Sequence, residues 1–154
     1  MQEPIFEAIV ETPIGKIKIT ADDDVILSID FTGDAPAVGG NTLCKRAAEE
    51  LGEYFSGKRK TFDLPLKKAS SAFARRVYEE AVKIPFGETA SYGELARAAG
   101  SPGGARAVGS AMSKNLHIIV VPCHRVIRQN GEPGRYTGGD EKKLALLAFE
   151  GAVS

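Results

Sequence analysis

Two segments near the N-terminus alternate between apolar and polar residues. Ile17 and Ile19 are flanked by lysines and a threonine, and the alternation resumes over residues 25–31 after an acidic run at residues 22–24. A period of two on both sides of a polar tip predicts a β-hairpin with one buried face. The stretch that follows, residues 34–40, is rich in Gly, Pro and Ala, and therefore predicts a loop.

From residue 42 the pattern changes to helical spacing. Apolar residues recur at every third or fourth position as far as Phe55, and Gly57 follows them. This spacing predicts an amphipathic helix that stops at Gly57. A sheet with one helix across it is the simplest arrangement for the first part of the chain.

The second half of the chain predicts a series of helices. Ser71 can cap a helix that carries apolar residues at helical spacing as far as Ile84. Ser91 and Glu94 stand at the spacing of a capping box, ahead of further apolar residues. We therefore expect a short helix to begin at this box and to end at Gly100.

A third helix is expected directly after Gly100, with Ser101 as its cap, Pro102 in its first turn and Asn115 at its end. Two short helices joined by a tight turn outline a helix-turn-helix, whose second helix is the one placed against DNA. That helix consists mainly of Gly, Ala and Ser, and Arg106 is its main protrusion. Such a flat surface suits either tight packing against another helix or close approach to a duplex, with Arg106 as an inserted probe.

The candidate for chemistry is Cys123. It follows the mainly apolar residues 116–121, which predict a buried extended segment, and it precedes His124. A thiol is mostly protonated at neutral pH, and a neighbouring histidine can take its proton to leave a nucleophilic thiolate. The alternative is a small buried hydrophobe, and this is our interpretation of Cys44, which shares its helix with apolar residues.

Composition excludes several classes of protein. The chain is 43% hydrophobic, with no apolar run of the length that a membrane span requires and no basic leader before an apolar stretch. We expect an intracellular, cytoplasmic protein without a membrane partner. The two cysteines and two histidines lack the spacing of a metal site, so we expect no metal, and a cytoplasmic chain of this size needs no disulfide.

Residues 58–68 are charged and contain Pro65, which predicts a connection between two domains, at residues 1–68 and 69–154. The total charge of zero hides a difference between the two halves. Up to residue 69 the chain has 9 Lys and Arg against 12 Asp and Glu, and beyond it 11 against 8. The second half is therefore the one to examine for contacts with nucleic acid, although this excess alone does not establish them.

Several ordered blocks together resemble one family, the O6-alkylguanine-DNA alkyltransferases, also called methylated-DNA–protein-cysteine methyltransferases. The blocks are Tyr92-Gly93-Glu94-Leu95-Ala96, Ala105-Arg106-Ala107-Val108-Gly109, Asn115, Pro122-Cys123-His124-Arg125-Val126, Gly134-Arg135-Tyr136-Thr137-Gly138-Gly139 and Leu147-Ala148-Phe149-Glu150. The resemblance implies an α+β protein. Its N-terminal domain would be a small ribonuclease-H-like β-sheet with a helix, and its C-terminal domain would be helical with a winged helix-turn-helix.

The resemblance also implies a reaction. Cys123 would accept an alkyl group from O6 of guanine, with His124 and Glu150 acting through a water as the base that generates the thiolate. Tyr92 and Lys143 would help the guanine to leave. No cofactor is required, and because no group in such a site cleaves the resulting thioether, each molecule would act once.

The implied partner is double-stranded DNA, bound through its minor groove by a monomeric protein. The target atom lies inside the base stack, so the nucleotide must rotate out before a fixed thiol can reach it. Arg106 would fill the vacated space, and Asn115 would tie the end of its helix to the segment that carries Cys123. Other contacts to DNA are expected from Ala105, Gly109 and Ser91. The pocket for the extruded base is expected to include Met112, Val126, Tyr136, Thr137 and Gly138.

Three other functions compete with this interpretation. Some relatives keep the fold without the acceptor cysteine and only mark lesions, and a helix-turn-helix also serves transcription regulators. Cys123 and His124 together could instead belong to a thiol hydrolase. The presence of Cys123 argues against the lesion marker, and the lack of an evident oxyanion-hole motif argues against the hydrolase.

Overall fold

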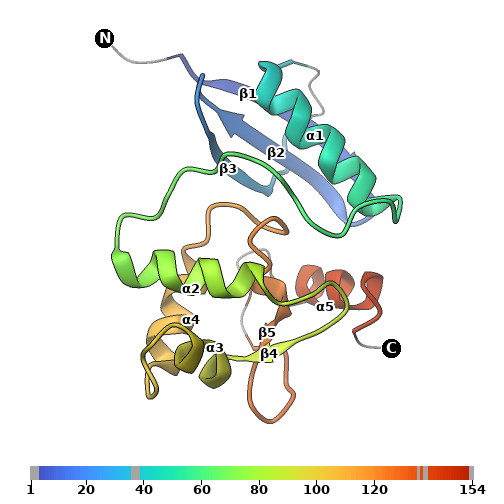
Figure 1. Cartoon of the computed structure of the whole chain (residues 1–154). Helices are drawn as coiled ribbons and strands as arrows, with labels where there is room; N and C mark the ends of the chain where they lie inside the picture. Colours follow the sequence, from blue (N-terminus) through green and yellow to red (C-terminus); the bar gives the residue numbers. More distant parts are fainter. Residues whose placement is uncertain (1–3, 36–38, 135, 137–138, 153–154) are drawn as a thin grey trace. The chain divides into compact units, whose positions relative to one another are not determined.

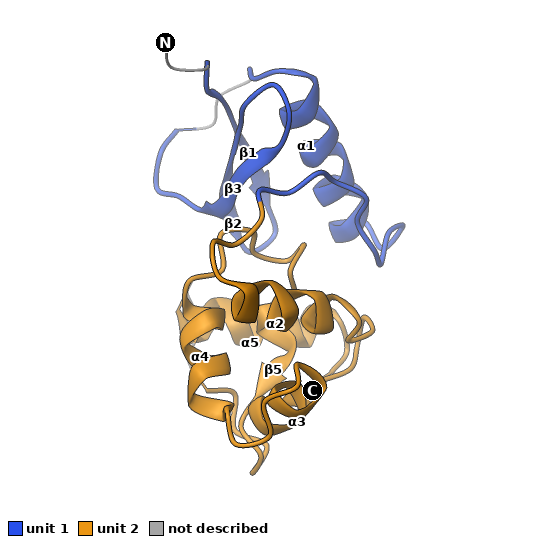
Figure 2. Cartoon of the chain, turned by 60° about the vertical axis from the view of Figure 1, so that its left-hand side comes forward, with its two compact units in different colours: residues 1–67 blue, residues 68–154 orange. Residues whose placement is uncertain are grey.

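The structure is a computed structural model, and it divides the chain into two compact units, residues 1–67 and 68–154 (Figures 1 and 2). Within them the structure describes residues 4–35, 39–134, 136 and 139–152.

Unit 1 is a three-stranded antiparallel sheet with one helix across one face (Figure 1). Its elements are β1 (Phe6–Thr12), β2 (Gly15–Ala21), β3 (Ile26–Phe31) and α1 (Thr42–Phe55). The predicted hairpin is confirmed as β2 and β3, and the Asp22 carboxylate closes its tip by accepting hydrogen bonds from the backbone N–H groups of Asp24 and Val25, both at 2.8 Å. The predicted helix is confirmed as α1.

Strand β1 was not predicted. Its sequence, FEAIVET, places Ile9 and Val10 side by side, which breaks the alternation that identifies a half-buried strand. The strand forms because β2 offers it a complete antiparallel partner, with Ala8 opposite Ile19 and Val10 opposite Ile17. Pairing with a neighbour, rather than local pattern, therefore decides this element.

The core of unit 1 lies between α1 and the sheet. Ile17, Ile19 and Ile29 from the strands and Leu51 and Tyr54 from the helix are almost completely buried. The start of α1 is fixed by an N-cap, because the Asn41 side chain accepts a hydrogen bond from the backbone N–H of Cys44 at 3.0 Å. Cys44 is fully buried, which confirms its interpretation as a small core residue.

Unit 2 is mainly helical (Figure 2). Its elements are α2 (Ala72–Val82), β4 (Ala90–Ser91), α3 (Tyr92–Ala98), α4 (Ala105–Ser113), the 3₁₀ turn η1 (Cys123–Arg125), β5 (Val126–Ile127) and α5 (Asp140–Phe149). The predicted caps are confirmed: Ser71 caps α2, and Ser91 with Glu94 forms a complete capping box at α3. The short strands β4 and β5 pair in parallel, which brings the start of α3 beside the chain that leaves η1.

The expected start of the third helix, at Ser101 and Pro102, was wrong by about one turn. Helix α4 begins at Ala105, with Gly104 as its N-cap and no side-chain capping bond. The backbone N–H of Gly104 donates instead to the carbonyl oxygen of Ser101 at 2.8 Å, in a tight turn. A Cβ on Gly104 would lie 2.7 Å from Oγ of Ser101, so this turn requires glycine there.

The expected extended segment at residues 116–121 was also wrong. Its residues 118–121 are buried, as predicted, but they form consecutive turns. The backbone N–H of Val120 donates to the carbonyl of Ile118, and Ile119 has a φ of 71°. An apolar run alone does not distinguish a buried strand from a buried coil, and here the turns fold the chain back toward Asn115.

Helices α3 and α4 are the predicted pair of short helices. They pack against each other, and both pack against α2. Tyr78 of α2 fixes the far end of α4, because its hydroxyl donates to the carbonyl oxygen of Ala111 at 2.6 Å. Among the described residues, no helix has both the length and the apolar character that crossing a membrane demands.

Candidate active site

Cys123 is the first residue of η1, and it is 4% exposed. Its sulfur accepts a hydrogen bond from Nδ2 of Asn115 at 3.1 Å. A hydrogen-bond donor stabilises a thiolate more than a neutral thiol, because the negative charge strengthens the bond. The thiol therefore sits beside a group that favours its reactive form.

The orientation of the Asn115 amide is fixed by the backbone around it. Its Oδ1 accepts from the backbone N–H of His117 at 3.0 Å, while Nδ2 also donates to the carbonyl oxygen of Val121 at 2.9 Å. Because the oxygen is already matched to a donor, the nitrogen must be the atom that faces sulfur. Asn115 thus joins the residues just beyond α4 to the chain that leads into Cys123.

His124 and Glu150 form a buried pair beside the thiol. Nε2 of His124 lies 2.8 Å from Oε2 of Glu150, and neither side chain is exposed. A carboxylate only accepts, so Nε2 carries the proton of the neutral ring and Nδ1 keeps its lone pair. Nδ1 is buried, and no atom of the described residues forms a hydrogen bond with it.

Burial lowers the pKa of His124 below its usual 6.5, against the opposing influence of Glu150. The ring is therefore neutral at neutral pH. A neutral imidazole with an unshared lone pair can take a proton, so the pair has the chemistry of a general base.

Lys143 lies in α5 and Glu150 is the C-cap of that helix, so the two residues are seven positions apart and lie near the same face, two turns from each other. Lys143 is fully buried, and its ammonium group donates to the carbonyl oxygen of Val126 at 2.6 Å and lies 5.7 Å from the centre of the Tyr92 ring. Burial lowers the pKa of Lys143 to about 8. Burial and the nearby Cys123 raise the pKa of Tyr92, which keeps its hydroxyl protonated.

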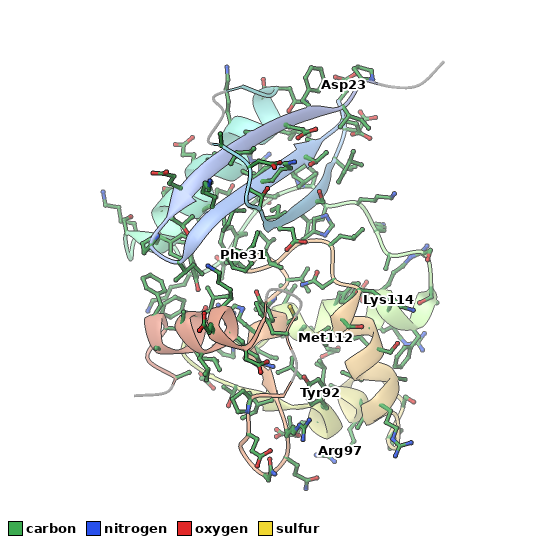
Figure 3. The ribbon with its side chains drawn as sticks, turned by 180° about the vertical axis from the view of Figure 1, so that it is seen from behind. Asp23, Phe31, Tyr92, Arg97, Met112 and Lys114 are labelled. Atoms are coloured by element: carbon green, nitrogen blue, oxygen red, sulfur yellow. The ribbon has the colours of Figure 1, made fainter. Side chains whose placement is uncertain are left out.

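Cys123 lies in the wall of a pocket of about 880 Å³, large enough for a nucleobase. Most of the wall comes from α4, and Tyr92 and Met112, labelled in Figure 3, line it from α3 and α4. The full lining is Tyr92, Ala105, Arg106, Gly109, Ser110, Met112, Ser113, Cys123, Arg128, Gly134 and Tyr136. The same pocket is therefore lined by Cys123 and by α4, the second helix of the helix-turn-helix.

Some predicted site residues lie elsewhere. Ser91 is buried as the cap of α3, and its hydroxyl accepts from the backbone N–H of Glu94. Val126 and Lys143 are buried beside the pocket and are not part of its lining. Thr137 and Gly138 lie outside the described residues. The roles expected of all these residues stay predictions.

Comparison with known proteins decides the family. A model described as the 6-O-methylguanine DNA methyltransferase DNA-binding domain matches residues 72–152, and one for the ribonuclease-like domain of the same proteins matches residues 5–68. The chain belongs to the 6-O-methylguanine DNA methyltransferase family. Its fold class is accordingly α+β, with a ribonuclease-like N-terminal domain, as the resemblance implied.

Relatives within this methyltransferase family are similar over most of their length. The methylated-DNA–protein-cysteine methyltransferase of Mycolicibacterium paratuberculosis is 43% identical, over 92% of this chain and 89% of the relative. The constitutive enzyme of that name from Bacillus subtilis is 40% identical, over 91% and 92%. Among solved structures, the Mycobacterium tuberculosis protein OGT in complex with DNA is 35% identical, with a TM-score of 0.82 and coverage of 94% and 92%.

The structure adds residues to the methyltransferase site that sequence reasoning missed. Arg125 lies inside the family block Pro122-Cys123-His124-Arg125-Val126, but no role was predicted for it. It is buried and forms an ion pair with Glu150. Arg128, Gly134 and Ser113 line the pocket. No local signal in the sequence selects Arg125, because its partner Glu150 is 25 positions away. Among the described residues, no group of three or more His, Cys, Asp or Glu side chains could hold a metal ion.

Proposed function

We propose that this chain repairs DNA by transferring the alkyl group of O6-alkylguanine, irreversibly, to the sulfur of Cys123. The observation that carries the proposal is the position of that sulfur. It receives a hydrogen bond from Asn115, neighbours the His124–Glu150 pair, and opens into the pocket that α4 lines. A thiol with a donor, a base and an opening of nucleobase size has what an alkyl acceptor needs.

In the proposed reaction the sulfur of Cys123 forms a bond to the alkyl carbon while the bond from that carbon to O6 breaks. The electron pair of the broken bond stays on guanine. The thiol proton passes through a water to Nδ1 of His124, which later returns it to solvent. The guanine anion takes one proton from solvent, which restores the normal base. Tyr92, protonated and in the pocket wall, donates a hydrogen bond to the leaving base.

Binding to duplex DNA is proposed to involve the face of α4 that lines the pocket. Ala105 and Gly109 leave this face flat, and Arg106 is exposed at it. A flat helix suits the minor groove, and an arginine at its surface can fill the space left by a base that has rotated into the pocket. Action as a monomer in the cytoplasm stays a prediction.

Transfer of a labelled methyl group tests the proposal. The protein is incubated with duplex DNA that contains radiolabelled O6-methylguanine, and protein-bound label is counted. We expect about one methyl group per molecule, no further turnover, no label on Cys123→Ala, and full label on the matched variant Cys44→Ala. Binding of the lesion without label would indicate a lesion marker. Absence of both would leave a regulator or a hydrolase.

A further inference from the structure

The side chain of Arg125 is buried in unit 2 and forms three hydrogen bonds. Its Nε donates to Oε1 of Glu150 at 2.8 Å, and its Nη2 donates to Oε2 at 2.9 Å. Its Nη1 donates to the carbonyl oxygen of Ile84 at 2.8 Å, and its guanidinium lies 5.8 Å from the centre of the Phe86 ring. The side chain is 5% exposed, so these bonds form away from water.

These contacts connect Arg125 to the buried His124–Glu150 pair, and not to the pocket. Oε2 of Glu150 accepts from both Nη2 of Arg125 and Nε2 of His124. Oε1 accepts from Nε of Arg125 and, at 3.3 Å, from the backbone N–H of Gly87. The carboxylate is thus held in one orientation, and Arg125 is absent from the pocket lining.

The charges of this cluster balance. Glu150 contributes one negative charge, Arg125 one positive charge, and neutral His124 none. Moving a net charge into a dry interior costs several kcal/mol, and a buried group avoids that cost by binding or releasing a proton. If the charge of Arg125 were removed, the His124–Glu150 pair would be left with a net negative charge and would bind a proton from solvent.

We propose that Arg125 is a positioning residue for alkyl transfer: by balancing the charge of Glu150, it keeps the buried His124–Glu150 pair ready to accept the proton of Cys123. This inference rests on the proposed function. A pair that already holds an extra proton cannot take one from the thiol, whichever atom carries it. The role is separate from that of a residue that touches the substrate.

The other charged groups around His124 are consistent with this account. Glu150 and Lys143 face it from α5, and Cys123 and Arg125 adjoin it in η1. Burial has the largest effect on the pKa of His124 and lowers it, Glu150 raises it, and Arg125 and Lys143 lower it. Loss of Arg125 therefore moves the proton affinity of the pair upward.

The test is the pH dependence of alkyl transfer to the full chain, with free O6-benzylguanine as substrate. In Arg125→Gln, which removes the charge, we expect transfer about tenfold slower at pH 7, and an acid limb of the rate profile displaced upward by about 1.5 pH units or more. Near pH 9.5 the rate returns to within about threefold of the unmodified protein, because hydroxide can then take the thiol proton in place of the base. Arg125→Lys, which keeps the charge, leaves the acid limb in place.

Equal slowing of Arg125→Gln at every pH would overturn the inference, since it indicates general damage to the site. An acid limb that moves as far in Arg125→Lys as in Arg125→Gln would also overturn the inference. If Arg125→Gln does not fold, the position of the acid limb in Arg125→Lys decides. A matched control is Arg59→Gln in unit 1, where Arg59 pairs with Glu53 and the buried Glu50; its profile should not move. Failure of the unmodified protein to transfer the group refutes the proposed function instead.

Discussion

The two cysteines of this chain are both buried, and they differ in what surrounds their sulfur atoms. The thiol of Cys44 points to carbonyl oxygens, of Phe6 at 3.5 Å and of Ile19 at 4.0 Å. The sulfur of Cys123 accepts from the amide of Asn115 at 3.1 Å. Acceptors favour the protonated thiol and donors favour the thiolate, so burial alone says nothing of reactivity.

Asparagines support both cysteines, in different ways. Asn41 binds the backbone N–H of Cys44 and caps α1, whereas Asn115 binds the sulfur of Cys123 itself. Access differs too. A Cβ on Gly40 would lie 2.9 Å from the sulfur of Cys44, which is therefore tightly enclosed, while Cys123 opens into a pocket. The comparison indicates that three features together define the alkyl-accepting cysteine: a hydrogen-bond donor at its sulfur, a neighbouring base and an opening into the pocket.

The largest effect is expected from removing the base. In His124→Gln the amide can still bind Glu150 but cannot take up a proton, so transfer from O6-benzylguanine at pH 7 should fall about 100-fold or more. The loss should shrink toward pH 9.5, where hydroxide can take the thiol proton in place of His124. In the unmodified protein the rate should stay high down to below pH 6.5, because burial lowers the pKa of His124, and should fall once the ring is protonated. Equal loss at all pH values would contradict a role as base.

Access to Cys123 by an everted base is tested with Arg106→Ala. Only a duplex requires extrusion, so transfer from duplex O6-methylguanine should slow by about 10- to 100-fold, the equivalent of a few kcal/mol, and transfer from free O6-benzylguanine by less than about twofold. Arg97→Ala is the matched control, since Arg97 is an exposed arginine of α3 outside the pocket lining (Figure 3). Equal losses on both substrates would remove Arg106 from extrusion.

The two asparagines can be compared directly. Asn115→Ala removes the donor at the sulfur and leaves the carbonyl of Val121 without this bond, so we expect transfer to slow by about tenfold and stability to fall by about 2 kcal/mol. Asn41→Ala should cost about 1 kcal/mol through the lost cap and leave the rate unchanged. Denaturant unfolding measures the stability, and single-turnover kinetics measures the rate. Similar rates in both variants would contradict the importance of the donor.

The smallest effect is expected at the rim of the pocket. Gly134 has a φ of 75°, and a Cβ there would lie 2.9 Å from the Tyr92 hydroxyl; Gly131 has a φ of 89° with nothing near. Both Gly134→Ala and Gly131→Ala should destabilise by about 1 kcal/mol. Only Gly134→Ala displaces the tyrosine, so it alone should slow transfer, by about three- to tenfold. A rate equally reduced in both would assign the effect to backbone strain.

Sequence patterns predicted the elements whose signals are local. The hairpin tip at residues 22–24, the cap at Ser71 and the capping box at Ser91 each depend on a few neighbouring residues, and all are confirmed. Strand β1 depends on a partner strand, so its own pattern did not reveal it. The start of α4 was misplaced because Ser101 and Pro102 resemble a cap, while the close approach at Gly104 is visible only in three dimensions.

For the site, motifs indicated the residues but not their contacts. The sequence named Cys123, His124 and Glu150, and the structure brings the last two within 2.8 Å through α5. The sequence offered no reason to select Arg125, because an arginine beside a histidine is usually a solvated charge. Its partner is 25 positions away, and this distance in sequence hides the ion pair.

Mass spectrometry of the unmodified protein tests the central claim most directly. After incubation with excess duplex O6-methylguanine, the chain is digested and both cysteine peptides are measured in the same sample. We predict one added methyl group on the peptide of Cys123 and none on that of Cys44. Methylation of Cys44, of both cysteines equally or of neither would contradict the account.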